Sequence, residues 1–305
     1  MKRFVIFILA LSGVLLGFDF AFGLCIDYIR KHAKGGQTHK IETVARGVKH
    51  DILIMGSSRA CHHYDPRVIS CATGMSTFNS GQDGNGIILM YGLLSMNLEH
   101  NTPKIIIYDV TPEYDIQVYD DDSNLRYLAL LKPFYHHPEI HDLIRDVSTK
   151  ESVKLLSNLY RYNSNWLTIV NDYFKGQEDP FQGYKPVYNR LSSLSQNQIE
   201  ESERIIDPIK QRFLQSMIRL VKERGIKLFF VFSPKAGHWD SSVFSPIETL
   251  CQAEGIPYFN YYFDEDLSTR PELFNDMYHL NDEGASLFSA KIATEILQEI
   301  QASER

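Results

Sequence analysis

Short, uninterrupted apolar runs alternate with helical spacing along most of this chain. The clearest runs lie at residues 51–55, 104–110 and 227–232, and weaker ones at 76–79 and 257–261. Continuous runs of this length are typical of strands that are buried on both faces, as in a parallel sheet. Helical spacing is found at 86–99, at 198–224 with a kink or restart at Pro208, and at 282–301. This alternation predicts an α/β domain with a five-stranded parallel sheet.

The middle of the chain interrupts this rhythm. Residues 113–197 are rich in Tyr, Asn and Asp, with short helical stretches around 139–160. We expect a mainly helical insertion that caps the C-terminal edge of the sheet. The predicted organisation is an N-terminal anchor or signal segment at 1–30, a polar stalk at 31–50 broken by Gly35 and Gly36, and an α/β domain at 51–302 that contains the insertion.

The N-terminus carries a longer apolar segment. Lys2 and Arg3 precede a run from Phe4 to Leu24. At a rise of about 1.5 Å per residue, this run reaches roughly 31 Å as a helix, which matches the hydrocarbon thickness of a bilayer. Positive charges before the run favour a topology with the N-terminus inside and the domain outside. The sequence therefore predicts a transmembrane helix.

Two features of this segment leave open whether it is a membrane span or a cleaved secretory signal. Asp19 lies within the run, and a carboxylate inside a bilayer costs a few kcal/mol unless it lies near an interface. Ala21 and Gly23 are small residues suited to cleavage, so a removed secretory signal is the alternative. Both interpretations place the domain outside the cytoplasm.

Charge and cysteine content exclude several function classes. The formal net charge is −7 and no basic run occurs in the 305 residues, which argues against a nucleic-acid partner. The four cysteines form no C-x-x-C pair, so a structural zinc site is not expected, and the sequence assigns no metal and no other cofactor. Cys61 and Cys71 are either free thiols or a disulfide in an oxidising compartment.

Candidate chemistry follows the predicted strands. Ser58 comes after the first strand, Gly81 after the second, and Asp276 and His279 lie just before the last helix. Ligand sites of open α/β sheets gather at these strand ends. A serine nucleophile needs a base that is oriented by a third group, and the Asp-x-x-His spacing lets the carboxylate reach Nδ1 while Nε2 faces the serine.

Two main-chain amides are the candidates for holding an oxyanion. The amide of Ser58 lies at a helix N-terminus, and Gly81 has no side chain to block a close approach. Taken alone, Ser58 is explained equally well as a helix N-cap and His279 as an ordinary loop residue. Their occurrence together with Asp276 favours catalysis.

Three sequence blocks carry a resemblance to a known family. Gly56 to Arg59 reads Gly-Ser-Ser-Arg, Asn79 to Gly81 reads Asn-Ser-Gly, and Asp276 to Asn281 reads Asp-Met-Tyr-His-Leu-Asn. Together they resemble the SGNH/GDSL hydrolase superfamily in the right order, over residues 51–297 with the insertion unmatched. The resemblance implies a flavodoxin-like three-layer fold and ester or acyl chemistry. Gly-Ser-Ser in place of Gly-Asp-Ser resembles the membrane-anchored branch that modifies cell-wall polymers, including proteins of teichoic-acid D-alanylation.

One block departs from the family pattern. An asparagine normally follows the third strand as an oxyanion donor, but here the position holds Asp109, which cannot donate when ionised. Asn85 is the candidate substitute. Arg59 is interpreted either as a ligand for an anionic substrate group or as an arginine on a helix surface.

The combined prediction is a bacterial serine esterase or acyltransferase. Its expected location is the periplasm or the outer face of the inner membrane. Its expected partners are an acylated envelope glycan, lipid-linked polymer or small ester as substrate, the membrane through the N-terminal helix, and a membrane-bound acyl-transfer protein. The alternative is a non-catalytic envelope protein that binds glycan or a membrane partner, which the missing asparagine favours.

Overall fold

The described residues contain one parallel sheet. The computed structural model describes residues 1–118, 124–194 and 205–303, and it divides the chain into two compact units. Unit 1 comprises residues 1–46 and 122–179, and unit 2 comprises residues 47–121 and 180–305.

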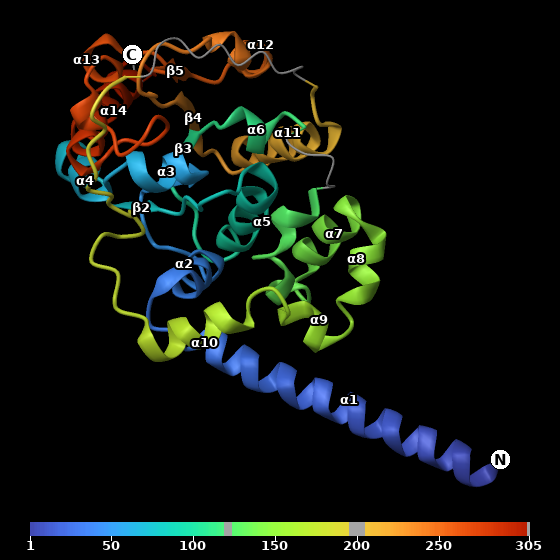
Figure 1. Cartoon of the computed structure of the whole chain (residues 1–305). Helices are drawn as coiled ribbons and strands as arrows, with labels where there is room; N and C mark the ends of the chain where they lie inside the picture. The colour runs from blue at the N-terminus through green and yellow to red at the C-terminus, as the bar shows by residue number, and fades with distance from the viewer. Residues whose placement is uncertain (119–123, 195–204, 304–305) are drawn as a thin grey trace. The chain divides into compact units, whose positions relative to one another are not determined.

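The sheet lies in unit 2 and confirms the prediction from the apolar runs. Its strands follow one another in the order β2-β1-β3-β4-β5, and every neighbouring pair is parallel (Figure 1). This is the flavodoxin-like order, which places a topological switch point between β1 and β3. The strands are β1 (Ile52–Gly56), β2 (Thr77–Asn79), β3 (Ile105–Asp109), β4 (Lys227–Phe232) and β5 (Tyr258–Asn260).

Helices cover both faces of this sheet. On one face α14 (Asp282–Ser303) packs against α3 (Ser58–His63) and α4 (Pro66–Thr73). On the other face α5 (Ile87–Asn97) packs against α6 (Pro112–Asp115) and α11 (Pro208–Glu223). Alternate residues of the strands therefore enter two cores. The remaining elements of unit 2 are η3 (Ser241–Phe244), α12 (Ser245–Glu254), α13 (Glu265–Ser268) and η4 (Pro271–Leu273).

The helix expected at 198–224 has its predicted restart at Pro208. Its described part starts at Pro208, where the Asp207 carboxylate accepts hydrogen bonds from the amides of Ile209 at 2.8 Å and Lys210 at 3.2 Å. A capping aspartate followed by proline is a strong start signal. Residues 198–204 of the predicted helix lie outside the described residues.

Unit 1 is helical throughout its described part. Its long N-terminal helix is α1 (Lys2–Lys31), followed by α2 (Gly36–Ala45). The insertion contributes η1 (Asn124–Leu128), η2 (Lys132–Phe134), α7 (Pro138–Val147), α8 (Thr149–Lys154), α9 (Asn158–Tyr162) and α10 (Trp166–Lys175). The segment expected to be a polar stalk thus holds a helix. Ile41 and Val44 of α2 are buried, and the amide of Thr38 donates to Asp172 of α10 at 2.9 Å.

The N-terminal helix has two different halves. Its first half is exposed and apolar, whereas Gly23, Ile26 and Arg30 are buried in unit 1, where α1 packs along α9 and α10. Within the described residues, α1 is the one helix long and apolar enough to cross a membrane.

Asp19 lies where the two halves of α1 meet. Its carboxylate accepts hydrogen bonds from the hydroxyl of Ser157 at 2.7 Å and from the amides of Asn158 at 2.9 Å and Leu159 at 2.8 Å. These amides belong to the first turn of α9, whose N–H groups have no partner within the helix. The charge that looks costly in the sequence is therefore satisfied by the folded part of unit 1.

Candidate active site

A tight turn after β1 presents Ser58 at the C-terminal edge of the sheet, beside the switch point. Gly56 ends the strand with φ +136, and a Cβ there would lie 2.5 Å from the carbonyl oxygen of Asp109. Only glycine fits this combination of backbone angle and close approach. Ser57 then serves as N-cap residue, and Ser58 is the first residue of α3.

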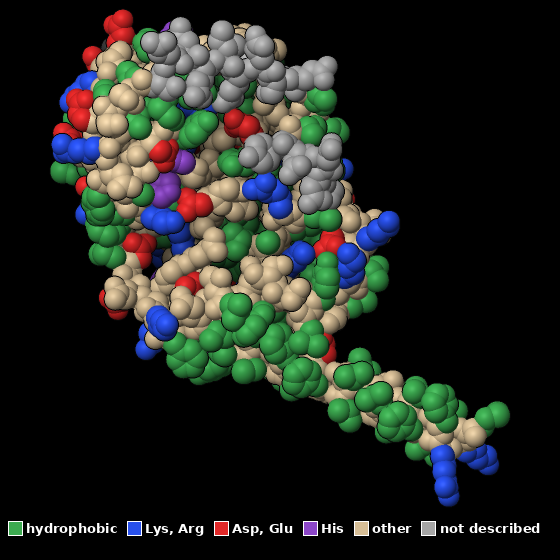
Figure 2. All heavy atoms as spheres, viewed as in Figure 1, with side chains coloured by type: hydrophobic (Ala, Val, Ile, Leu, Met, Phe, Trp, Pro, Cys, Tyr) green, Lys and Arg blue, Asp and Glu red, His purple; other side chains and the backbone are tan. Residues whose placement is uncertain are grey.

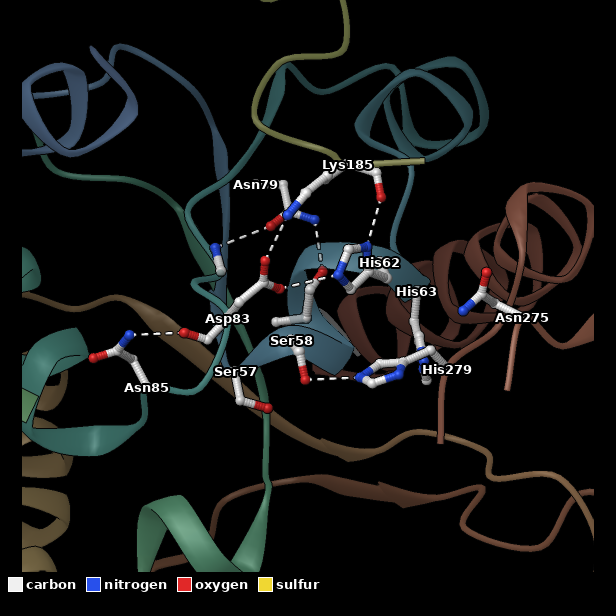
Figure 3. Close-up of polar contacts among 12 residues, drawn as sticks. Ser57, Ser58, His62, His63, Asn79, Asp83, Asn85, Lys185, Asn275 and His279 are labelled. Atoms are coloured by element: carbon white, nitrogen blue, oxygen red, sulfur yellow. Dashed lines mark hydrogen bonds and ion pairs between the residues drawn. The ribbon is translucent and has the colours of Figure 1, made fainter. Parts of the chain in front are cut away.

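The structure brings Ser58, His279 and Asp276 together. His279 Nε2 lies 2.8 Å from Ser58 Oγ (Figure 3), and His279 Nδ1 lies 3.0 Å from Asp276 Oδ1. The loop before α14 supplies both the acid and the base, whereas α3 supplies the serine. The chain of contacts runs from carboxylate to imidazole to hydroxyl, which is the geometry that activates a serine.

Asp276 is held in its ionised form. Burial alone raises its pKa, but hydrogen bonds from the His279 ring and from the Tyr278 amide lower the pKa more, to well below its usual range. Asp276 Oδ1 accepts from the amides of Tyr278 at 2.8 Å and His279 at 3.0 Å, and Oδ2 accepts from Asn275 Nδ2 at 2.8 Å. The carboxylate can therefore stabilise a positive charge on His279 without moving.

His63 fixes the loop on the far side of His279. Its ring is fully buried, with Nε2 accepting from the amide of Leu280 at 3.0 Å and Nδ1 lying 3.0 Å from Ser233 Oγ. Burial, followed by the charge of His279 and of Arg59, holds the pKa of His63 well below its ordinary value. The neutral ring thus donates to Ser233 and accepts from Leu280.

His62 lies one helical turn after Ser58, beside the His279 ring at a centroid distance of 5.4 Å. Its Nδ1 is 2.6 Å from the carbonyl oxygen of Lys185, and its Nε2 is 3.0 Å from Asp83 Oδ1. The ammonium of Lys185 pairs with the other oxygen of Asp83 at 2.7 Å. These interactions tie α3 to the loop after β2 and to the segment around Lys185.

Cys61, His62 and Asp83 are the one group of potential metal ligands found in the described part of the chain, with their ligating atoms within 4.8 Å of one another. Asp83 is already neutralised by Lys185. Burial raises the pKa of Asp83, and the hydrogen bonds from His62 and Lys185 lower it more, to below its ordinary range. Cys61 and Cys71 are both free thiols.

Arg59 is not a surface arginine. Its side chain is buried, and the guanidinium donates to the main-chain carbonyls of Val110 and, at 3.4 Å, Ser233. Its Nε lies 3.7 Å from Asp109, whose other oxygen accepts from the Tyr64 hydroxyl at 2.5 Å. Asp109, at the position of the family's asparagine, thus anchors Arg59, and both side chains are engaged in holding α3 to the end of β3.

The remaining oxyanion candidates face other partners. The Gly81 amide donates to Asn79 Oδ1 at 3.0 Å, and a Cβ at Gly81 would lie 2.6 Å from the Cys61 amide nitrogen. Glycine is therefore needed here for close packing against α3. Asn85 is turned away from Ser58 and donates to the carbonyl oxygen of Asp83 at 2.9 Å (Figure 3). The Ser58 amide, at the first position of α3, has no acceptor within the helix.

Lys235 lies after β4 and is buried rather than solvent-exposed. Its ammonium lies over three aromatic rings, with centroids at 4.2 Å for Trp239, 4.9 Å for Tyr278 and 5.0 Å for Tyr262. Such contacts attract a cation to the faces of the rings. The stack supports Tyr278, the neighbour of His279 in the chain.

Several of these supporting residues escape sequence reasoning. Ser233 and Asp83 come from segments distant from Ser58 in the sequence, and the spacing of His63 and Tyr64 at the end of α3 does not reveal their partners Leu280 and Asp109. His62 is the exception, because its distance of one helical turn from Ser58 places it on the same face of α3.

No protein-family model and no curated protein matches this chain. Solved structures resemble it at the level of the backbone. One is a protein from Desulfitobacterium hafniense whose name assigns it to lipolytic proteins of the G-D-S-L family, with 9% identity, a TM-score of 0.41, and 80% of this chain and 98% of that chain covered. Another is a protein from Bacteroides fragilis named as an acylhydrolase, with 12% identity, a TM-score of 0.43, and 88% and 98% covered. Similarity this distant carries no functional conclusion, which has to come from the site itself.

Proposed function

We propose that this chain is a serine-dependent esterase or acyltransferase with Ser58, His279 and Asp276 as its catalytic triad. The observation that carries the proposal is the continuous contact from Asp276 through His279 to Ser58, with 3.0 Å at the carboxylate and 2.8 Å at the hydroxyl. A serine used only as a helix cap does not require a histidine oriented by an acid on its outer side.

The chemistry follows from these contacts. His279 Nε2 takes the proton of Ser58 Oγ as the oxygen attacks an ester carbonyl, and the carbonyl oxygen becomes an oxyanion. Asp276 stabilises the imidazolium and keeps Nε2 toward the serine. His279 then returns the proton to the leaving alcohol as the ester C–O bond breaks, which leaves an acyl group on Ser58. Water or a sugar hydroxyl, deprotonated by His279, attacks the acyl-enzyme and releases the serine.

The Ser58 amide is the donor proposed for the oxyanion. Removing a single oxyanion donor typically costs about 10²–10³ in rate, so a site with few donors turns over slowly. The Gly81 amide donates to Asn79 and the Asn85 side chain donates to Asp83, so neither donor is directed at an oxyanion in this structure. This favours the second candidate function, a non-catalytic protein that binds glycan or a membrane partner.

The packing of α1 supports an uncleaved membrane anchor. Cleavage after Ala21 or Gly23 would remove Asp19, which caps α9, and cleavage after Gly23 would also remove Phe22, which packs edge-to-face on Tyr162 at 6.5 Å. With Lys2 and Arg3 inside, the folded units lie in the periplasm or on the outer face of the inner membrane. The substrate class proposed from this location is an acylated envelope glycan or lipid-linked polymer, with a membrane-bound acyl-transfer partner on the transferase route.

The first test is covalent labelling of the full chain in detergent with a fluorophosphonate, read by intact mass. We expect one adduct on Ser58 that is absent from Ser58→Ala and His279→Ala. Cys251→Ala is the matched control, because this buried thiol lies outside the site. A folded protein that shows neither an adduct nor Ser58-dependent turnover of p-nitrophenyl acetate would favour the binding protein. Acyl release that requires a sugar acceptor would identify a transferase.

A further inference from the structure

Unit 1 carries an apolar surface beside its N-terminal helix. Six large apolar side chains of the insertion are exposed by 40–73%, which is unusual for a water-facing surface. We call them the α8–α10 patch: Val153, Leu156, Leu159, Trp166, Leu167 and Phe174. Figure 2 shows hydrophobic side chains gathered where α10 lies and continuing along α1.

The patch is continuous with α1 through direct contacts. The amide of Leu159 donates a hydrogen bond to Asp19. Leu159 therefore lies beside the point on α1 where the exposed half ends. A surface groove joins the two elements, with Phe20 and Leu24 of α1 on one side and Leu156 on the other. Because α1, α9 and α10 belong to one compact unit, the depth of α1 in a bilayer also sets the depth of the patch.

The length of the exposed half of α1 indicates how deeply the patch enters a bilayer. From Phe4 to Phe18, α1 is exposed on all sides over about 15 residues, or roughly 22 Å of helix, and beyond Asp19 only the face with Phe20 and Leu24 stays exposed. The hydrocarbon core of a bilayer is about 30 Å thick. An apolar helix that is shorter than the hydrocarbon core either thins the bilayer locally or brings the residues that follow it into the membrane.

We propose that the α8–α10 patch lies in the lipid bilayer, at the interfacial layer where α1 leaves the membrane. This inference rests on the membrane span proposed above and names lipid as the occupant of the patch. Immersing the patch supplies the apolar length that α1 lacks and removes the exposed Leu167 and Phe174 from water. Trp166 lies at the level where tryptophan is enriched in membrane proteins, and Lys175, in the last turn of α10, can extend to the headgroups.

The tryptophan content makes the test direct. The chain contains two tryptophans, Trp166 in the patch and the buried Trp239 in unit 2. The full chain is reconstituted in phosphatidylcholine vesicles whose acyl chains are brominated near the headgroup end, and emission is compared with unbrominated vesicles. Subtracting the signal of Trp166→Phe isolates Trp166 without altering Trp239. We expect a loss of Trp166 emission in the brominated vesicles, and no loss from Trp239.

A second variant pair guards against a folding artefact. Leu167→Glu and Phe174→Glu are expected to reduce the quenching of Trp166 while the chain stays in the vesicle pellet after carbonate extraction. Extraction of the wild-type chain by carbonate would contradict the membrane span itself. Retention of the chain with Trp166 unquenched would overturn the present inference alone. A dimer cross-linked through the patch would do the same, because a second copy would then occupy it.

Discussion

The buried ring of His63 accepts a hydrogen bond from the amide of Leu280 at 3.0 Å, and Leu280 directly follows His279. The position of His279 is therefore fixed from both sides, by Asp276 before it in the chain and by His63 after it. His63 and Ser58 lie on the same short helix, α3, so one element carries the nucleophile and also anchors the base that serves it.

His63 is predicted to be a positioning residue. His63→Leu leaves the amide of Leu280 and the hydroxyl of Ser233 without this partner and frees the loop, and a misplacement of about 1 Å can cost on the order of 10²-fold in rate. We expect the rate of Ser58 labelling to fall by about that factor. His63→Gln, which can still accept from Leu280, should recover much of it. Equal loss in both variants at matched thermal stability would contradict the positioning role.

Stability is predicted to fall as pH rises from about 4 to about 7 because of Asp115. This carboxyl group is fully buried on α6, and burial, only partly offset by hydrogen bonds from Tyr108 and Thr111, raises its pKa to about 7. The folded state then holds a proton that the unfolded chain has already released above its ordinary pKa of 3.8. The free energy of unfolding should decline between pH 4 and pH 7, by a few kcal/mol from this group, and level off above about pH 7.

Thermal unfolding of the full chain in detergent from pH 5 to pH 8 measures this decline. Asp115→Asn cannot ionise, so the slope that Asp115 contributes should disappear in this variant, whatever the change in absolute stability. An identical pH slope in both proteins would show that Asp115 is ionised in the folded state throughout the range.

Asp19 is predicted to stabilise the start of α9 from within the N-terminal helix. Asp19→Ala removes the acceptor for Ser157 and for two first-turn amides, at a cost of about 1–2 kcal/mol. Limited proteolysis of the reconstituted chain should then cut faster near residues 155–165. Asp19→Asn keeps one acceptor and should be intermediate. Since removing a charge favours insertion into lipid, poorer membrane binding is not expected and cannot account for the cleavage.

The sheet and the contact between Asp276 and His279 could be predicted because both depend on local patterns. Buried parallel strands are continuously apolar, so each apolar run marks a strand, and a carboxylate three residues before a histidine meets it within one loop. The partners of Arg59 could not be predicted in this way. Asp109 comes from the next strand of the sheet and Ser233 from the loop after β4, and nothing in the spacing shows that these carbonyls and carboxylates converge on one guanidinium.

The role of Gly81 and the helix in the expected stalk could not be predicted for the same reason, because both depend on contacts with distant parts of the sequence. A glycine after a strand fits an oxyanion donor and a close packing contact equally well, and only the position of Cys61 shows that packing requires it. The polar segment before the first strand looks like a linker because its apolar residues are few. Ile41 and Val44 are nevertheless buried in unit 1, where α2 packs against α1 and α10.

The hydrogen bond from Ser157 to Asp19 joins residues 138 positions apart, and this separation has a consequence for biosynthesis. The N-terminal helix leaves the ribosome first, whereas its partners in α9 are made much later. At about 5–20 residues per second, the groups that satisfy the charge of Asp19 are synthesised roughly 7 to 28 seconds after it. During that interval another group, such as water, must solvate the carboxylate, so the charge of Asp19 is satisfied within unit 1 only after the insertion has been synthesised.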